Sequence, residues 1–309
     1  MSRIRLDGYA DGGQPASPAP ATGPAASLLG QYTRREIESA IRRLPPLPNT
    51  LGDLVDKLNN PDSSVRDITA RIRTDPSLTT RLLRMANSAF YGPRAHITDV
   101  DRAVVVLGFR TTRNLVAAAA VASHFATFKN IHSFGPQGMY RHSLAVAVFC
   151  QTLALRAGAA ELTPEEFFVA GLLHDIGRIP LAQLYKTHRR EFEALPYDLA
   201  ALVACEQELF GLDHTVVGGM VADHWKLPEI YRELIAGHHT IEATGGGGAP
   251  ALVALADRWT NGRGIGRTQP FSTEAAVARL ADAAHVEPAL IAGIEADFRH
   301  ELEFYLTTI

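Results

Sequence analysis

Apolar residues recur every three or four positions along most of this chain, and this period limits the possible folds more than any other feature. Leu78, Leu82 and Leu83 form one such stripe, and Leu144 and Val148 belong to another. A period of 3.6 residues places these side chains on one face of an α-helix, whereas a half-buried strand needs strict alternation of apolar and polar residues. The sequence contains no sustained alternation. We therefore expect an all-α fold built as a multi-helix bundle.

Capping and breaking residues set the expected helix ends. Thr33 and Glu36 have the spacing of a capping box, and Asp75-Pro76 supplies an acidic cap followed by a proline at the first helical position. Gly108 is expected to separate two neighbouring helices. Short helices are expected near 51–58, 65–72 and 76–86. Further helices are expected at 99–107, 111–127, 137–157, 164–174, 178–185, 187–194, 197–210, 214–225, 228–238, 250–261, 273–282 and 287–306.

The chain divides into three expected regions. Residues 1–32 are rich in Pro, Gly and Ala without an apolar period, which is typical of a disordered tail. Residues 33–130 form an N-terminal helical half, and residues 131–309 form a histidine-rich half that includes the C-terminal helices. No Pro/Gly/Ser-rich spacer separates the two halves, so we expect them to pack against each other.

Charge and composition narrow the class of protein. The sequence has 30 Lys and Arg against 33 Asp and Glu, a net charge of -3, and this balance disfavours a nucleic-acid partner. No apolar run approaches the ~20 residues of a membrane span, and the N-terminus lacks the pattern of a secretory signal. Two cysteines do not make a disulfide framework. We expect a cytoplasmic protein that does not bind membranes.

The heptapeptide Gly171 to Gly177 contains the most informative pair, His174-Asp175, at the end of an apolar helix. Gly177 is expected to permit a sharp turn there. A neutral imidazole and a carboxylate at a helix end suit a divalent metal. The dipeptide alone could equally be a surface turn.

Other histidines and acids at helix ends strengthen the case for a metal. His142 and His214 begin apolar helices, and His238-His239 ends a third. Asp257 lies within an apolar segment, where an isolated carboxylate is costly unless it is paired or bound to metal. Each residue also has a simpler interpretation, such as a surface position for His142 or an ion pair for Asp257. Their joint occurrence favours a metal site, and nitrogen and oxygen ligands without thiolate suit iron, manganese or zinc.

This order of residues resembles the HD superfamily, whose members hold divalent metals in a helical bundle with a histidine, a His-Asp pair and a later aspartate. His214 and one of His238 and His239 resemble the additional ligands of cyclic-di-GMP phosphodiesterases, with the other histidine of the pair expected to point away. The Gly-Tyr-Pro motif of that branch is missing, and Arg178 replaces the usual lysine. The residues matching the superfamily pattern are His142, His174, Asp175 and Asp257.

The N-terminal half resembles the HDOD (HD-related output domain) family more specifically. The resemblance covers about residues 40–260 and implies an HD-like helical core with an N-terminal helical subdomain. Many HDOD proteins are signalling output modules that have lost metal ligands, whereas this chain retains them. The motifs that carry the resemblance are Leu44 to Pro48, Asp75 to Leu78, Leu82 to Gly92 and Ala103 to Gly108.

The resemblance implies two alternatives. The first, which we favour, is a signalling module that binds metal and acts on a protein partner, a phosphorylated small ligand or a second copy of itself. The second is a metal-dependent phosphohydrolase or phosphodiesterase acting on a nucleotide or cyclic dinucleotide. In the second, Asp175 would bridge two metals, and Arg178, with Arg141 as a weaker candidate, would pair with phosphate. The candidate catalytic residues are Asp175 and Arg178, and the candidate metal ligands are His142, His174, Asp175, His214, His238, His239 and Asp257.

Overall fold

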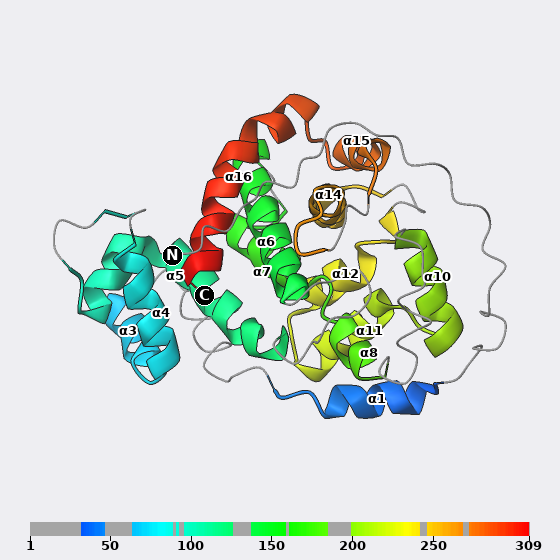
Figure 1. Ribbon diagram of the computed structural model, residues 1–309, viewed down its shortest axis with the longest axis horizontal. Coiled ribbons are helices and arrows are strands. Elements are labelled where there is room, and N and C mark those ends of the chain that lie inside the picture. The colour runs from blue at the N-terminus through cyan, green and yellow to red at the C-terminus, as the bar shows by residue number, and fades with distance from the viewer. Residues whose placement is uncertain are drawn as a thin grey trace.

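A computed structural model (Figure 1) describes residues 32–46, 64–88, 91–92, 96–125, 137–158, 161–184, 199–241, 246–267 and 272–308. The expected tail, apart from Tyr32, and the expected helices at 51–58 and 187–194 lie outside these residues. Within them the fold is all-α, as the apolar period predicted. The helices are α1 (Arg34–Arg42), α3 (Val65–Ile72), α4 (Pro76–Ala86), α5 (Val100–Phe125), α6 (Gly138–Ala157), α7 (Pro164–Leu173), α8 (Arg178–Leu184), α10 (Leu199–Phe210), α11 (His214–His224), α12 (Glu229–Gly237), α14 (Gly248–Gly262), α15 (Glu274–Ala283) and α16 (Pro288–Thr308).

The expected caps are present. The Thr33 hydroxyl accepts the Glu36 backbone N–H, and the Glu36 carboxylate accepts the backbone N–H of Thr33, which completes the capping box of α1. Asp75 accepts from the Leu78 backbone N–H and so caps α4 in the same way. These bonds satisfy backbone donors that a helix N-terminus leaves without a partner.

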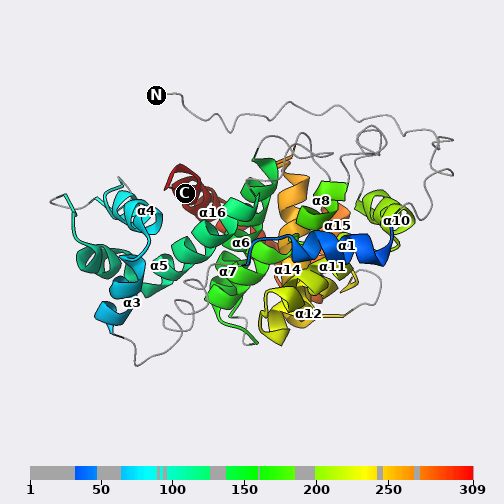
Figure 2. The same ribbon diagram turned by 90° about the horizontal axis from the view of Figure 1, so that it is seen from below.

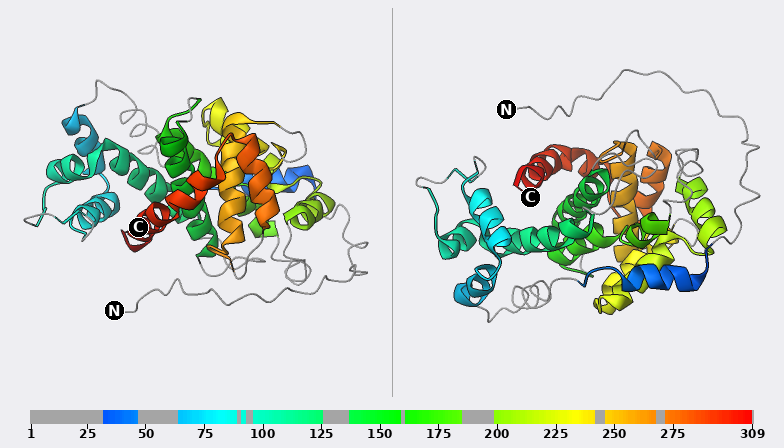
Figure 3. Two further views of the ribbon diagram at one scale, coloured as in Figure 1. Left: turned by 90° about the horizontal axis from the view of Figure 1, so that it is seen from above. Right: turned by 60° about the horizontal axis from the view of Figure 1, so that its bottom comes forward.

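Helix α6 lies at the centre of the bundle, and α7, α14 and α16 pack around it (Figure 1). Aromatic rings join three of these helices. The rings of Phe149 and Trp259 stack with centroids 3.9 Å apart, and Phe298 meets both rings edge-on at 5.5 and 4.9 Å. Helices α14 and α15 lie side by side on the outer face (Figure 3). This packing fixes α14 against α6, and the two helices carry Asp257 and His142.

The N-terminal helices contact the rest of the fold at two places. Helices α3 and α4 gather on the first part of α5, and α5 then continues to α6 and α7 (Figure 1). Helix α1 lies across α8 and α11, at the opposite end of the molecule from α3 and α4 (Figure 2). Gly108 interrupts α5 with φ 76° and ψ 163°, so the expected break between two helices is confirmed.

Among the described helices, α5 contains one stretch, Val100–Ala122, that is long and apolar enough to cross a membrane by length and composition. Half of its most apolar window is buried inside the protein, and Gly108 breaks the helix within that span. Its contacts with α3, α4, α6 and α7 are those of a packed core helix.

Candidate metal centre

A close contact between two helices aligns the first two histidines. A Cβ atom on Gly171 in α7 would lie 2.8 Å from Cα and 2.9 Å from the backbone nitrogen of Ala147 in α6. Glycine is therefore needed for the two backbones to approach this closely. The approach places the buried rings of His142 and His174 with centroids 5.3 Å apart.

Gly177 has a different role from the one the sequence suggested. The turn after His174-Asp175 is present, but Gly177 is not among the glycines with positive φ. A Cβ atom here would instead overlap the His214 carbonyl oxygen and the Gly218 backbone nitrogen. Glycine is needed at position 177 because α11 starts directly against the turn. This contact brings His214, the first residue of α11, to the candidate metal centre.

The seven candidate ligands lie in two adjacent groups. Within each group the possible ligand atoms are all within 4.8 Å of one another. The groups adjoin at the His-Asp pair, where His174 Nε2 lies 3.6 Å from Asp175 Oδ2. We call the seven residues the His/Asp cluster. The first group is His142, His174 and Asp257; the second is Asp175, His214, His238 and His239.

Two histidines of the cluster are oriented by the same type of hydrogen bond, from the ring to a backbone carbonyl oxygen. His174 Nδ1 lies 2.8 Å from the Gly171 carbonyl oxygen, and His238 Nδ1 lies 2.7 Å from that of Ile235. Because a carbonyl only accepts, each Nδ1 carries the proton and each Nε2 keeps its lone pair. Both Nε2 atoms are buried without a hydrogen-bond partner among the described residues. A divalent metal would supply the missing partner, so the cluster fits such an ion.

Asp257 is held by side chains on both sides. Its Oδ1 lies 2.9 Å from His142 Nε2 and accepts a hydrogen bond of 2.7 Å from the Asn261 amide. Arg267, itself buried, donates to the Asn261 carbonyl oxygen. Although burial would raise the pKa of the Asp257 carboxyl, the neighbouring His142 and His174 side chains hold that pKa well below its ordinary value. Asp257 is thus kept ionised, as a metal ligand must be.

The cluster also keeps most of its imidazoles neutral. Burial lowers the pKa of His142 to about 4 and that of His238 to about 3, and it lowers the pKa of His239 as well. Burial would also lower the pKa of His174, but the neighbouring Asp175 and Asp257 carboxylates together outweigh burial and raise that pKa. Neutral imidazoles offer the nitrogen lone pairs that bind metals.

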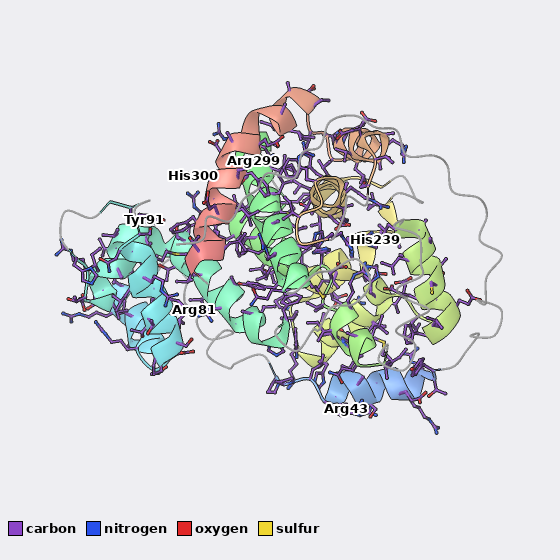
Figure 4. The ribbon with its side chains drawn as sticks, in the orientation of Figure 1. Arg43, Arg81, Tyr91, His239, Arg299 and His300 are labelled. Atoms are coloured by element: carbon purple, nitrogen blue, oxygen red, sulfur yellow. The ribbon has the colours of Figure 1, made fainter. Side chains whose placement is uncertain are left out.

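Both histidines of the His238-His239 pair face the cluster. We expected one of them to point away, and this expectation was wrong. Residues 238–240 form a turn after α12, and the possible ligand atoms of both histidines lie within 4.8 Å of those of Asp175 and His214. The two rings lie 3.9 Å apart, and His239 is 5.0 Å from the His214 ring. Figure 4 shows His239 between the helices on the inner side of the molecule.

The two candidate arginines lie in different surroundings. Arg178 is buried beside the cluster, where it forms an ion pair with Asp175. Arg141 is partly buried and lines a cavity of about 90 Å³ together with Trp259 and Phe298; none of the seven cluster residues lines that cavity.

Glu206 is a member of this site that our sequence analysis missed. It is fully buried, accepts a hydrogen bond from Arg178, and its other oxygen lies 2.5 Å from His214 Nδ1. Carboxylates commonly orient metal-binding histidines in this way. A signal was available in the sequence, because Glu206 falls on the same helical face as Leu202, Leu209 and Phe210.

Comparison with known proteins places this fold among related chains. A crystal structure of an HDOD domain protein of unknown function from Geobacter sulfurreducens is 26% identical, with a TM-score of 0.68 over 89% of this chain and 95% of that one. A candidate phosphohydrolase from Shewanella amazonensis SB2B is 25% identical, with a TM-score of 0.62 over 89% of this chain and 98% of that one.

A Treponema pallidum (strain Nichols) protein, itself uncharacterized, is 25% identical over 212 residues. The alignment covers 66% of this chain but only 39% of the length of that relative. The HDOD domain model matches residues 44–241, which include six of the seven cluster residues. Because this match spans more than half of the 309 residues, the chain belongs to the HDOD family.

Proposed function

We propose that this protein is a signalling module of the HDOD type whose His/Asp cluster binds a divalent metal. The observation that carries the proposal is the buried Nε2 atom of His174, which keeps a free lone pair beside the carboxylates of Asp175 and Asp257. Leaving such groups buried without a partner is costly, so a bound cation would stabilise the fold. His142, His174, Asp175 and Asp257 would hold this ion.

The donor set favours iron, manganese or zinc. It contains imidazole nitrogens and carboxylate oxygens, and the two cysteines, Cys150 and Cys205, lie outside both groups. Imidazole suits iron and zinc, and carboxylate suits manganese. The Nδ1 contacts of His174 and His238 hold their rings in place before an ion binds, which reduces the ordering cost of binding.

In the proposed module, the metal stabilises one arrangement of the helices that a signalling partner or a phosphorylated small ligand recognises. The cluster is suited to this role because its ligands come from α6, α14 and the ends or starts of α7, α11 and α12. An ion bound to all of them would couple the relative positions of these helices. A partner that binds one arrangement better than another would then respond to metal occupancy.

A metal-dependent phosphohydrolase or phosphodiesterase is the second candidate, and the presence of two adjoining ligand groups favours it. Metals in such a site would lower the pKa of bound water and stabilise charge on a phosphoryl group. In this alternative, Asp175 would contribute a carboxylate to both groups, and the Arg178 guanidinium would pair with phosphate oxygens. The candidate substrates are a nucleotide or a cyclic dinucleotide.

Elemental analysis and an activity assay test the proposal together. Purified protein loaded in turn with Fe²⁺, Mn²⁺ and Zn²⁺ and then desalted should retain stoichiometric metal, whereas Asp175→Ala should retain none. Asp223→Ala, which removes an exposed carboxylate from α11, is the matched control and should bind metal like the wild type. Equal metal content in the wild type and in Asp175→Ala would refute the metal site. Hydrolysis of a cyclic dinucleotide or a generic phosphate ester by the loaded wild type would favour the second candidate.

A further inference from the structure

The Arg178 guanidinium lies between two residues of the second ligand group. Its Nε is 2.8 Å from Asp175 Oδ1, and its Nη2 is 3.1 Å from His214 Nε2. Asp175 Oδ1 and His214 Nε2 are themselves 3.3 Å apart. A single positive group therefore contacts the carboxylate and the imidazole nitrogen that a metal in this group would use.

The position of Arg178 is set by a second carboxylate. Glu206 accepts a 3.1 Å hydrogen bond from Arg178 Nη1, and its other oxygen accepts from the His214 backbone N–H at 2.9 Å. Arg178 and Glu206 are 4% and 0% exposed, so water does not compete for these contacts. An arginine does not lose its proton in a protein, and the positive charge is permanent.

The tautomer of His214 follows from the same contacts. Its Nδ1 faces a Glu206 carboxylate oxygen 2.5 Å away and donates to it. The Nε2 lone pair therefore faces Arg178 and accepts its N–H. A metal would need this same lone pair at a distance of about 2.0–2.1 Å, and the guanidinium stands in the way.

We propose that the Arg178 guanidinium occupies the place of a second metal ion, so that the His/Asp cluster holds one divalent ion and one built-in cation. This inference rests on the proposed metal centre and specifies its stoichiometry. The first group, with Asp175, remains open for the divalent ion. Repulsion between the guanidinium and a second divalent ion adds to the loss of the His214 ligand.

A one-metal centre bears on the choice between the two candidate functions. A two-metal site clamps both the attacking and the leaving oxygen of a phosphate ester. A guanidinium can pair with phosphate oxygens, but it has no coordination position for water. A one-metal centre therefore favours the signalling module over two-metal hydrolysis.

Metal counting with Mn²⁺ alone as the probe tests the proposal. Metal-stripped full-length protein is titrated with Mn²⁺, free ion is followed by its electron paramagnetic resonance signal, and the count is repeated by elemental analysis after desalting. The wild type should bind one ion per chain, and Arg178→Met should bind two. His238→Gln in the Arg178→Met background should return the count to one, which would locate the new ion in the second group. Arg156→Met, which removes an exposed positive charge on α6, should bind one.

A second variant provides a control in case Arg178→Met misfolds. Arg178→Met leaves the buried Glu206 carboxylate without its arginine partner, and breaking a buried ion pair is more damaging than removing both of its charges. The double variant Arg178→Met/Glu206→Gln removes both charges and should also bind two ions. Circular dichroism checks that both variants fold.

Each other result overturns the proposal in a recognisable way. Two ions in the wild type would show that Arg178 does not fill the second group, and this count needs no variant at all. One ion in the wild type and in both folded variants would overturn the role of Arg178 and leave the metal centre standing. No ion in any of the proteins would refute the metal centre itself, and the inference with it.

Discussion

Replacing Asp175 with asparagine removes one charge from the centre of the cluster and keeps the size of the side chain. The Asp175 carboxylate lies within 4 Å of nitrogen atoms of four residues. Burial opposes its ionisation, but Arg178 and His174 hold its pKa well below the ordinary value, so the wild-type residue is charged at neutral pH. An amide oxygen is a much weaker ligand for a divalent ion than this carboxylate.

The magnitude follows from linkage between binding and folding. An ion that binds only the folded protein stabilises it by about 2.7 kcal/mol at a hundredfold excess over its dissociation constant. For a chain of this size, each kcal/mol corresponds to about 2–4 °C in Tm, so the ion should raise Tm by about 5–10 °C. Asp175→Asn should lose this increment because it no longer binds the ion.

Differential scanning calorimetry with and without a chelator measures the increment within each protein. The chelator should lower the Tm of the wild type by the full amount and leave that of Asp175→Asn unchanged. Asp223→Asn, at an exposed position on α11, should respond to the chelator like the wild type. Equal chelator shifts in the wild type and in Asp175→Asn would refute the reasoning, because the carboxylate would then contribute nothing to metal binding.

Three further outcomes are expected. In metal-free protein, the pKa values of about 4 for His142 and about 3 for His238 lie below the ordinary 6.5, so the unfolded chain binds more protons in acid. The free energy of unfolding, measured with urea, should therefore be constant above pH 6.5. As the pH falls from about 6.5 to 4, it should decrease by about 1.4 kcal/mol per pH unit for each imidazole. A free energy of unfolding that does not change over this pH range would contradict the prediction. Gly177→Ala should lower the free energy of unfolding in urea by about 1–3 kcal/mol, because the new Cβ atom would overlap the α11 backbone. Gly293→Ala, which has open space around the new Cβ atom, should leave this free energy unchanged or raise it. Calorimetry should show one unfolding transition, and two resolved transitions would contradict packed halves.

Local patterns in the sequence were sufficient for the helices. The apolar period and the caps at Thr33 and Asp75 predicted helix starts that the structure confirms, because these signals act within one or two turns. Gly108 likewise broke α5 where expected. Such features depend on neighbours along the chain, so the sequence alone contains them.

Contacts between distant segments could not be predicted in the same way. Glu206 meets Arg178 across 28 residues, and nothing local marks that pairing. The role of Gly177 depends on where α11 lies, and a Gly after a His-Asp pair reads equally well as a simple turn. The His239 ring lies 5.0 Å from the ring of His214, a residue 25 positions earlier in the chain, and nothing in the local sequence marks this contact. All three follow from tertiary packing.

Two helices end at the cluster, and this arrangement has an electrostatic consequence. His174 and His238 are the C-terminal caps of α7 and α12, so the carboxyl ends of both helices face the same small volume. Each such end carries about half a negative charge and favours a nearby cation by about 0.3–1 kcal/mol. The same field repels an anion. If the proposed module takes a phosphorylated ligand, the helix ends would repel that ligand until a divalent ion is bound, and the expected order of binding is cation first and anion second.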